Sequence, residues 1–236
     1  MSANADVLQG SGLLDSPARE TTSPLIGVSS RPHDWNPQDF ACEQIRGLVR
    51  QVFLTRRAAP IKQVVFSAAD PQTDVAGICH QVGRALSLET NADIAIVDRS
   101  QTPQVTPVLI NPTVGKIPIK SSAGRLGINL WRVPQIGSSE RDRRSGSSRY
   151  WLAFLAELRD EFEYVVIHGP AAGVSSEAAL LGHISDGIIL VLDAQSTRRA
   201  TARKIKETLE SAQSRILGTV LCERTFPVPE RLYRRL

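Results

Sequence analysis

The sequence has little cysteine, few aromatic residues and no long uncharged apolar run. Its three cysteines, Cys42, Cys79 and Cys222, are scattered and odd in number, so they indicate neither a disulfide framework nor a paired-cysteine metal site, and we expect buried free thiols. No stretch approaches the roughly 18 uncharged apolar residues that a membrane helix needs. The first ten residues also lack the basic start and apolar core of a secretory signal. We therefore expect a cytoplasmic protein, with peripheral attachment at the inner face of the cell membrane as an alternative.

Net charge is small but unevenly distributed along the chain. The formal net charge is +4, and residues 198–236 hold ten Lys or Arg against four Asp or Glu, whereas residues 1–197 hold eighteen against twenty. A basic end is typical of proteins that bind nucleic acid, an anionic membrane or an acidic protein patch, and also of a solvated helix face. Apart from Phe226 and Tyr233 no aromatic residue is interleaved with these cations, so we expect no nucleic-acid partner.

Composition divides the 236 residues into three parts. Residues 1–36 are rich in Ser, Thr, Pro, Gly and Asn, which predicts a flexible N-terminal arm. Residues 37–57 have apolar side chains at helical spacing, and we predict an amphipathic helix that begins an α/β domain over residues 37–224. Residues 225–236 form a basic C-terminal tail.

Short apolar runs, rich in β-branched residues, alternate with segments of helical periodicity through this domain. The runs occupy residues 63–67, 93–98, 126–133, 164–169, 187–193 and 216–222. Strands that are apolar throughout and separated by helices are typical of a parallel sheet covered on both faces. We therefore predict a doubly wound, mainly parallel α/β sheet flanked by helices. Segments 99–123 and 134–149 have no such pattern, and the second is predicted to be a mobile surface loop.

Polar segments follow four of these runs, at the edge where doubly wound sheets bind ligands. They read SAADPQTDVA, VDRS, VIHGPA and VLC; the helix EQIRGLVRQVF precedes them, and DGIILVLDAQSTRRATARK and PERLYRRL lie in the C-terminal third. In this order and spacing the blocks resemble the cytoplasmic bacterial tyrosine kinases of capsule and exopolysaccharide synthesis, a partition-type branch of the P-loop ATPases. The resemblance covers roughly residues 38–224 and implies a P-loop NTPase-like fold.

The resemblance places the phosphate-binding loop on a segment that has lost the residues for it. That segment is Ala69, Asp70, Pro71, Gln72, Thr73, Asp74 and Val75. A phosphate loop works through backbone N–H groups freed by glycines, one lysine, and a hydroxyl that binds magnesium. Here there is no glycine from Ser67 to Ala76, Pro71 removes a donor, and Asp74 and Val75 occupy the Lys and Ser/Thr positions. The sequence thus predicts a degenerate nucleotide site.

The other positions that the resemblance marks are altered in the same direction. Asp98 keeps one metal-motif carboxylate, whereas Ser100 and His168 stand where two further carboxylates would be, and Cys222 replaces an asparagine that would recognise the base. We therefore name no catalytic residue and expect no metal and no cofactor. ATP with magnesium is expected only if the chain is an active kinase.

These residues also have a structural interpretation. Thr73 or Asp74 is suited to cap the following helix, where a carboxylate would lie in the positive field of the helix N-terminus. Asp98 and His168 would then pair across neighbouring strand ends. A zinc site is a further alternative, for which the sequence gives no ligand spacing; its ligands would be Asp98, His168, His80 and Cys222.

The first helix carries three charged residues at which the related kinases assemble into rings. Glu43 and Arg46 match that pattern and Arg50 is displaced by one position, so the resemblance implies a homo-oligomer. An ordinary pair between Glu43 and Arg46 within one helix is the alternative.

Three functions are compatible with these observations. The first is a catalytically impaired regulatory or scaffold subunit of exopolysaccharide synthesis and export, whose partner would be a membrane chain-length regulator (co-polymerase). The second is an active tyrosine kinase that neutralises phosphate through Arg46 or Arg50 of a neighbour, or through Arg198 and Arg199, with Tyr233 as the phosphorylated residue. The third is a partition-like binder of anionic surfaces or nucleic acid, whose binding would weaken steeply with salt.

Overall fold

The computed structural model describes residues 37–98, 118–134 and 148–223. The predicted N-terminal arm, the C-terminal tail with Tyr233, Ser100 and most of the two irregular segments lie outside these ranges. All elements described below belong to the compact unit that begins at Trp35.

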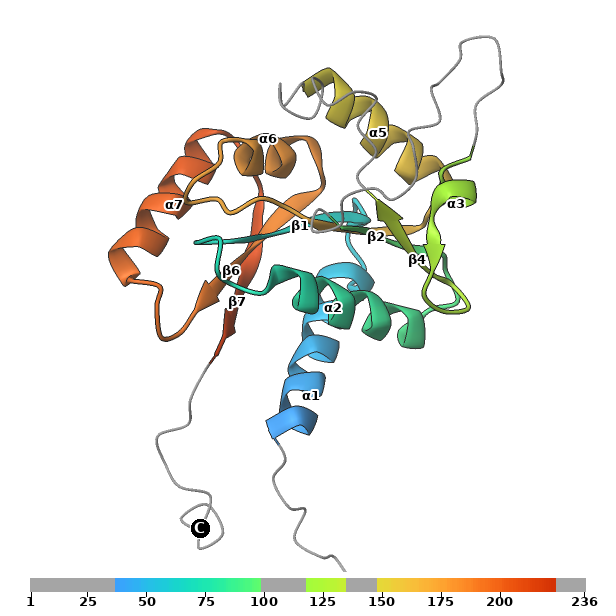
Figure 1. Cartoon of the computed structure of the whole chain (residues 1–236), viewed down its shortest axis with the longest axis horizontal. Coiled ribbons are helices and arrows are strands. Elements are labelled where there is room, and N and C mark those ends of the chain that lie inside the picture. Colours follow the sequence, from blue (N-terminus) through green and yellow to red (C-terminus); the bar gives the residue numbers. More distant parts are fainter. Residues whose placement is uncertain (1–36, 99–117, 135–147, 224–236) are drawn as a thin grey trace, which may run out of the picture. The chain divides into compact units, whose positions relative to one another are not determined.

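A seven-stranded sheet forms the centre of this unit, in the order β3-β4-β2-β5-β1-β6-β7 (Figure 1). Neighbouring strands run parallel except β3, which is antiparallel to β4. The strands are β1 (Gln63–Ala68), β2 (Ile94–Asp98), β3 (Gly124–Arg125), β4 (Leu130–Pro134), β5 (Tyr164–His168), β6 (Gly187–Asp193) and β7 (Ile216–Cys222). The predicted doubly wound, mainly parallel sheet is confirmed.

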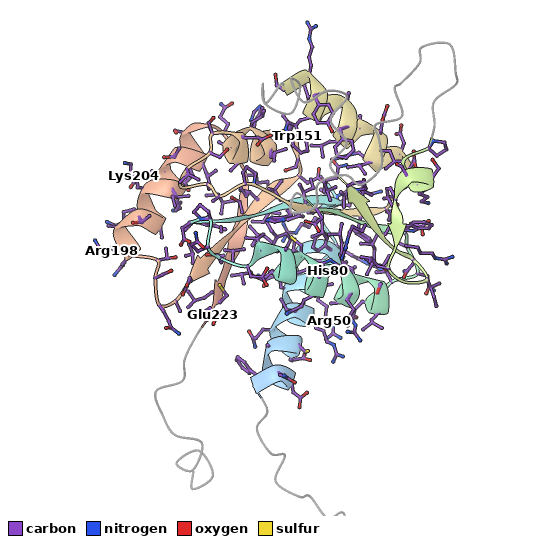
Figure 2. The ribbon with its side chains drawn as sticks, viewed as in Figure 1. Arg50, His80, Trp151, Arg198, Lys204 and Glu223 are labelled. Carbon is purple, nitrogen blue, oxygen red and sulfur yellow. The ribbon has the colours of Figure 1, made fainter. Side chains whose placement is uncertain are left out.

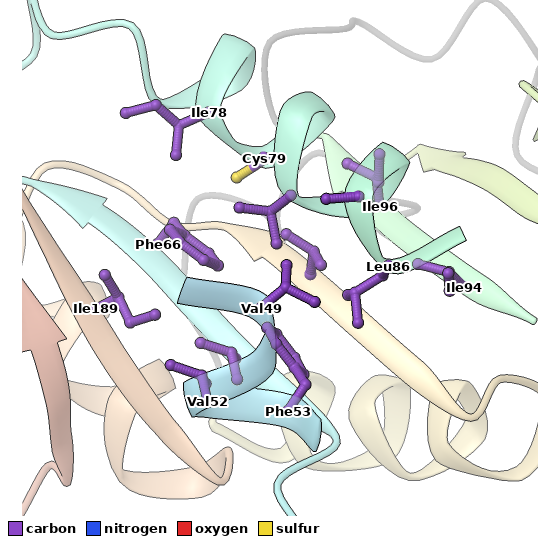
Figure 3. Packing of buried hydrophobic residues seen from close by; sticks show 14 of the residues in the cluster. Val49, Val52, Phe53, Phe66, Ile78, Cys79, Leu86, Ile94, Ile96 and Ile189 are labelled. Carbon is purple, nitrogen blue, oxygen red and sulfur yellow. The ribbon is translucent and has the colours of Figure 1, made fainter. Parts of the chain in front are cut away.

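Helices cover both faces of the sheet (Figure 1). They are α1 (Pro37–Val49), the π-helix η1 (Arg50–Leu54), α2 (Val75–Glu89), α3 (Ile119–Ser122), α5 (Ser148–Glu161), α6 (Glu177–Ile184) and α7 (Arg199–Ser211). One face packs against η1, α2 and the end of α1, where Phe53, Leu86 and Val49 are buried against the central strands (Figure 3). The other face packs against α5, α6 and α7 through residues such as Trp151, Leu181 and Ile205.

Asp186 joins three elements at the amino end of the central strands. Its carboxylate accepts hydrogen bonds from the backbone N–H groups of Lys62 and Gln63, at 2.7 and 2.8 Å, and pairs with Arg159 of α5 at 2.9 Å. Burial alone would raise the pKa of Asp186, but the two backbone donors and Arg159 outweigh it and lower the pKa from its ordinary value. This end of the sheet is therefore held by a well-partnered carboxylate.

Gly187 begins β6 in a conformation that suits glycine, with φ +155°. A Cβ atom there would lie 2.6 Å from the Leu217 side chain and 2.7 Å from the Arg215 carbonyl oxygen. Because β6 and β7 are adjacent, this glycine permits their close approach at the start of the pair.

Three sequence-based expectations are wrong in detail. The predicted strand 126–133 is a hairpin instead, because Leu126 N donates to Leu130 O at 2.8 Å and the chain turns through Gly127 before β4. The first helix ends at Leu54 rather than near residue 57, since its last turn is η1. Of the three cysteines, Cys79 is buried and Cys222 partly so, but Cys42 on α1 is exposed.

Candidate functional site

The carboxyl ends of β1, β2, β5, β6 and β7 meet at one edge of the sheet because these strands are parallel. The loop between β1 and α2 lies at this edge, followed by the ends of β2 at Asp98, of β5 at His168 and of β7 at Cys222. The structure thus brings the sequence-predicted site residues to a common edge, as the fold requires.

Backbone N–H groups of the loop after β1 are used within the protein. Ala69 N donates to Val191 O of β6 at 3.0 Å, and Gln72 N donates to the Asp70 carboxylate at 3.0 Å. Val75 N donates to Thr73 O at 2.9 Å. A phosphate loop directs such donors together at the ligand. In this loop, by contrast, these three donors are hydrogen-bonded within the protein.

Asp74 caps α2 with its side chain. Its Oδ1 accepts a hydrogen bond from Gly77 N at 2.8 Å, which satisfies one of the N–H groups left open at the start of the helix. A carboxylate also suits the positive end of the helix dipole. The structural interpretation is confirmed for Asp74 and not for Thr73, and a side-chain anion occupies the start of the helix.

The segment after β5 closes over the loop after β1. Ala172 N donates to Ala68 O at 2.8 Å, and Ser67 Oγ donates to Pro170 O at 2.6 Å. Gly173 lies so close to Ala69 that a Cβ atom on it would collide with the Ala69 carbonyl oxygen. The two loops therefore pack backbone against backbone at this edge of the sheet.

Asp98 and His168 approach each other across β2 and β5. The His168 Nδ1 atom lies 3.5 Å from the Asp98 Oδ1 atom, and Asp98 is buried to 4 % exposure. The predicted contact between these two strand ends is confirmed.

Burial raises the pKa of the neighbouring Cys79 thiol, and the charges of Asp98 and Asp74 raise it further, so this thiol stays protonated.

The alternative zinc set is not brought together. His80 Nε2 lies 2.8 Å from an Arg132 guanidinium nitrogen, and Cys222 Sγ donates to Leu192 O at 3.3 Å. Within the described ranges, no three His, Cys, Asp or Glu side chains are grouped closely enough to hold a metal ion. The partner Arg132 was not anticipated, because it lies 52 positions from His80 and nothing in the local pattern links the two.

The ends of β6 and β7 carry acidic and sulfur groups. The Asp193 carboxylate accepts from Gln195 N at 2.7 Å and from the Ser196 hydroxyl at 2.8 Å, which fixes the turn into α7. Burial raises the pKa of Cys222, and the charge of Asp193 raises it further. Arg198, the residue before α7, and Arg199, its first residue, are both exposed (Figure 2 labels Arg198).

The charged residues of the first helix make contacts within the chain. Arg46 lies 3.6 Å from Glu43, one turn away, and both side chains are about half exposed or more. Arg50 pairs with Glu89 of α2 at 2.7 Å, which links η1 to the end of α2. The intrahelical pair named as the alternative is therefore present, while α1 from residue 38 to residue 44 remains exposed.

The sheet order, the helix placement and the loop after β1 give a P-loop NTPase-like fold, which the chain shares with MinD and with a ParA family ATPase. By structure, the chain is similar to the kinase domain of Escherichia coli tyrosine kinase ETK, with TM-score 0.62 and 14% identity over 80% of this chain and 79% of that one. It is also similar to the cell division protein MinD of Aquifex aeolicus, with TM-score 0.52 and 13% identity over 74% and 72% of the two chains. Likenesses at such identities show the fold alone.

By sequence, 72 residues are 32% identical to the tyrosine-protein kinase CpsD of Streptococcus agalactiae. The match covers 30% of this chain and 31% of CpsD, so it spans about a third of that relative's length. No protein-family model matches the chain. The resemblance to bacterial tyrosine kinases is confirmed over this segment, and the P-loop NTPase-like fold over most of the domain. Among the described helices none is long and apolar enough to cross a membrane.

Proposed function

We propose that this chain is a catalytically impaired relative of the bacterial tyrosine kinases that acts as a regulatory or scaffold subunit in exopolysaccharide or capsule synthesis and export. The observation that carries the proposal is the cap on α2. Asp74, at the position of the phosphate lysine, accepts a hydrogen bond from Gly77 N and places a negative charge where a triphosphate would bind. A phosphate brought there would meet repulsion instead of neutralisation.

Three further features support the loss of nucleotide handling. Donors of the loop are used internally, Val75 offers no hydroxyl for magnesium, and His168 stands opposite Asp98 where a second carboxylate would complete a magnesium site. The residues present therefore fit Mg-ATP poorly.

The proposed partner is the cytoplasmic end of a membrane chain-length regulator, and it follows from the resemblance to CpsD-like kinases. The exposed part of α1, with Glu43 and Arg46, is the proposed contact between copies of this chain. Arg46→Glu should then lower the mass found by sedimentation, and Lys204→Glu, an equal change of charge on exposed α7, should leave it unchanged. An unchanged mass for Arg46→Glu would remove the assembly role of α1.

Thermal unfolding with and without Mg-ATP tests the proposal. A ligand at a hundredfold excess over its dissociation constant stabilises the folded state by about 2.7 kcal/mol, so a binder would unfold several degrees higher. We expect no shift at millimolar Mg-ATP for the natural chain. A clear shift would contradict the proposal, and transfer of radiolabelled phosphate to the chain that Tyr233→Phe abolishes would establish the active kinase.

A loop graft sharpens the same test. Replacing Pro71, Asp74 and Val75 together by Gly, Lys and Thr supplies flexibility, a phosphate cation and a magnesium ligand. Gain of a nucleotide-dependent shift in this variant, and not in the natural chain, would show that the fold is competent and that these positions are what it lacks.

A further inference from the structure

A groove separates α7 from the outer strand of the sheet. It has a volume of about 560 Å³. One wall is the flank of α7, with Arg199, Arg203, Lys206, Glu207 and Glu210, and the other is the first half of β7, Ile216–Thr219. Figure 1 shows α7 lying beside β6 and β7 at this end of the sheet. No residue of the groove belongs to the loop after β1, so the groove is distinct from the nucleotide-type edge.

The strand wall of the groove is an open sheet edge within the described part of the chain. Strand β7 pairs with β6 and with no other described strand. Its seven residues, ILGTVLC, contain no charge and no proline, which are the usual devices that protect an edge from pairing. Leu221 is 55% exposed, and a Cβ atom on Gly218 would meet nothing within 4 Å. Backbone donors and acceptors along this edge are therefore accessible to an added strand.

The helix wall carries three cations, Arg199, Arg203 and Lys206, against two carboxylates, Glu207 and Glu210, and so has a small net positive charge. Arg199 and Arg203 have no carboxylate partner among the residues that the structure describes, and Lys206 lies 3.4 Å from Glu210. Arg199 lies in the first turn of α7, where the helix dipole disfavours positive charge. Its placement does not stabilise the helix, so an anionic partner is the better reason for it.

We propose that an extended acidic segment of a partner protein adds to the edge of β7 and places its carboxylates against Arg199 and Arg203. The spacing is suitable, because alternate side chains of a strand lie about 6.6–6.8 Å apart and residues four apart on a helix about 6 Å. Backbone pairing would give affinity and the cations would select the charge of the segment, as in other strand-addition complexes.

Two occupants from this chain itself fit less well. The segment that follows β7, residues 224–236, carries four arginines against one glutamate, so the cationic flank of α7 would repel it. A second copy pairing β7 to β7 about a two-fold axis perpendicular to the sheet would bring the two α7 flanks to the same face. Their like charges oppose that arrangement.

Fluorescence anisotropy with the full chain tests the proposal. The probe is a fluorescein-labelled heptapeptide in which glutamate and valine alternate, at about 50 mM salt, where screening is modest. We expect the Arg199→Glu, Arg203→Glu double variant to lose at least about tenfold in affinity. The matched control is Lys204→Glu together with Arg198→Glu, which changes charge equally on residues that do not line the groove and should lose less than about threefold. Figure 2 labels both residues.

A second peptide separates strand addition from attraction between surface charges. It has the same sequence with alternate backbone nitrogens methylated, which keeps the charge and removes the donors of a strand. We expect it to bind at least about tenfold more weakly. Equal binding of the methylated peptide, equal losses in the two double variants, or no binding at millimolar concentration would each overturn the proposal. A β7-mediated dimer that the peptide dissociates in sedimentation would assign the edge to a second copy instead.

Discussion

The two ends of the central strands are both organised by aspartates, but the two sets make different contacts. At the amino end Asp186 binds two backbone donors and Arg159, and it joins β1, α5 and the turn before β6. At the carboxyl end Asp74 binds the N–H of its own helix, and Asp98 faces His168. The first carboxylate holds distant parts of the fold together, whereas Asp74 acts at the start of its own helix. The comparison shows that the contribution of a carboxylate to the fold depends on how far apart in the sequence its partners lie.

The largest expected effect is at the amino end. Asp186→Ala leaves the N–H groups of Lys62 and Gln63 without their acceptor and removes the partner of Arg159, so we expect a loss of about 3 kcal/mol in the free energy of unfolding. Urea unfolding measures it. Glu207→Ala, on the exposed side of α7, is the control and should change stability by less than about 0.5 kcal/mol. Equal effects of the two changes would contradict the role given to Asp186.

The same carboxylate predicts a pH dependence. Because its pKa in the folded chain lies below the ordinary value of 3.8, its contribution is fully present above that value and is lost as pH falls through the folded pKa. The stability difference between the natural chain and Asp186→Asn should therefore be constant from neutral pH to about pH 5 and shrink below pH 4. A stability difference between the two chains that persists unchanged in acid would show that the charge of Asp186 does not stabilise the folded chain.

At the carboxyl end the expected effect is smaller. Asp74→Ala removes the cap of α2 and should cost about 1 kcal/mol, a fall of about 2–4 °C in Tm. Asp74→Asn should cost little, since asparagine caps as well as aspartate. If both changes destabilise equally, charge and not the hydrogen bond to Gly77 is the cause, and the structural half of the comparison fails.

The smallest effect concerns reactivity and not stability. We expect iodoacetamide at about pH 8 to modify Cys42 first, then Cys222, and Cys79 last, because Cys42 is exposed while burial raises the pKa of the other two thiols. Peptide mass spectrometry gives the order. Early modification of Cys79 would mean that α2 opens readily from the sheet, which the buried packing in Figure 3 does not suggest.

Local patterns predicted most of the fold. The apolar runs predict strands at 187–193 and 216–222, and both predictions match the observed bounds. Apolar runs of this length between turn residues favour a buried strand. The prediction of one strand over residues 126–133 is wrong, since an apolar stretch that includes Gly127 and Asn129 suits a turn as well as a strand.

The site was predictable only in its local part. The cap by Asp74 follows from three residues of sequence, and the approach of Asp98 to His168 follows from adjacent strand ends. The bond from Ala69 N to Val191 O, and the contact of His80 with Arg132, join residues 122 and 52 positions apart. Such contacts depend on sheet order and helix placement, which the sequence of either partner does not contain.

Two glycines at the junction of β6 and β7, Gly187 and Gly218, should differ in how well they tolerate substitution. Any side chain at Gly187 would meet Leu217 and the Arg215 carbonyl in a backbone conformation that other residues rarely adopt, while one at Gly218 would extend into open space. In a saturation-mutagenesis library selected for soluble expression, the first position should remain glycine and the second should accept most residues. The outermost strand would then be free to diversify its sequence while its attachment to the sheet stays fixed.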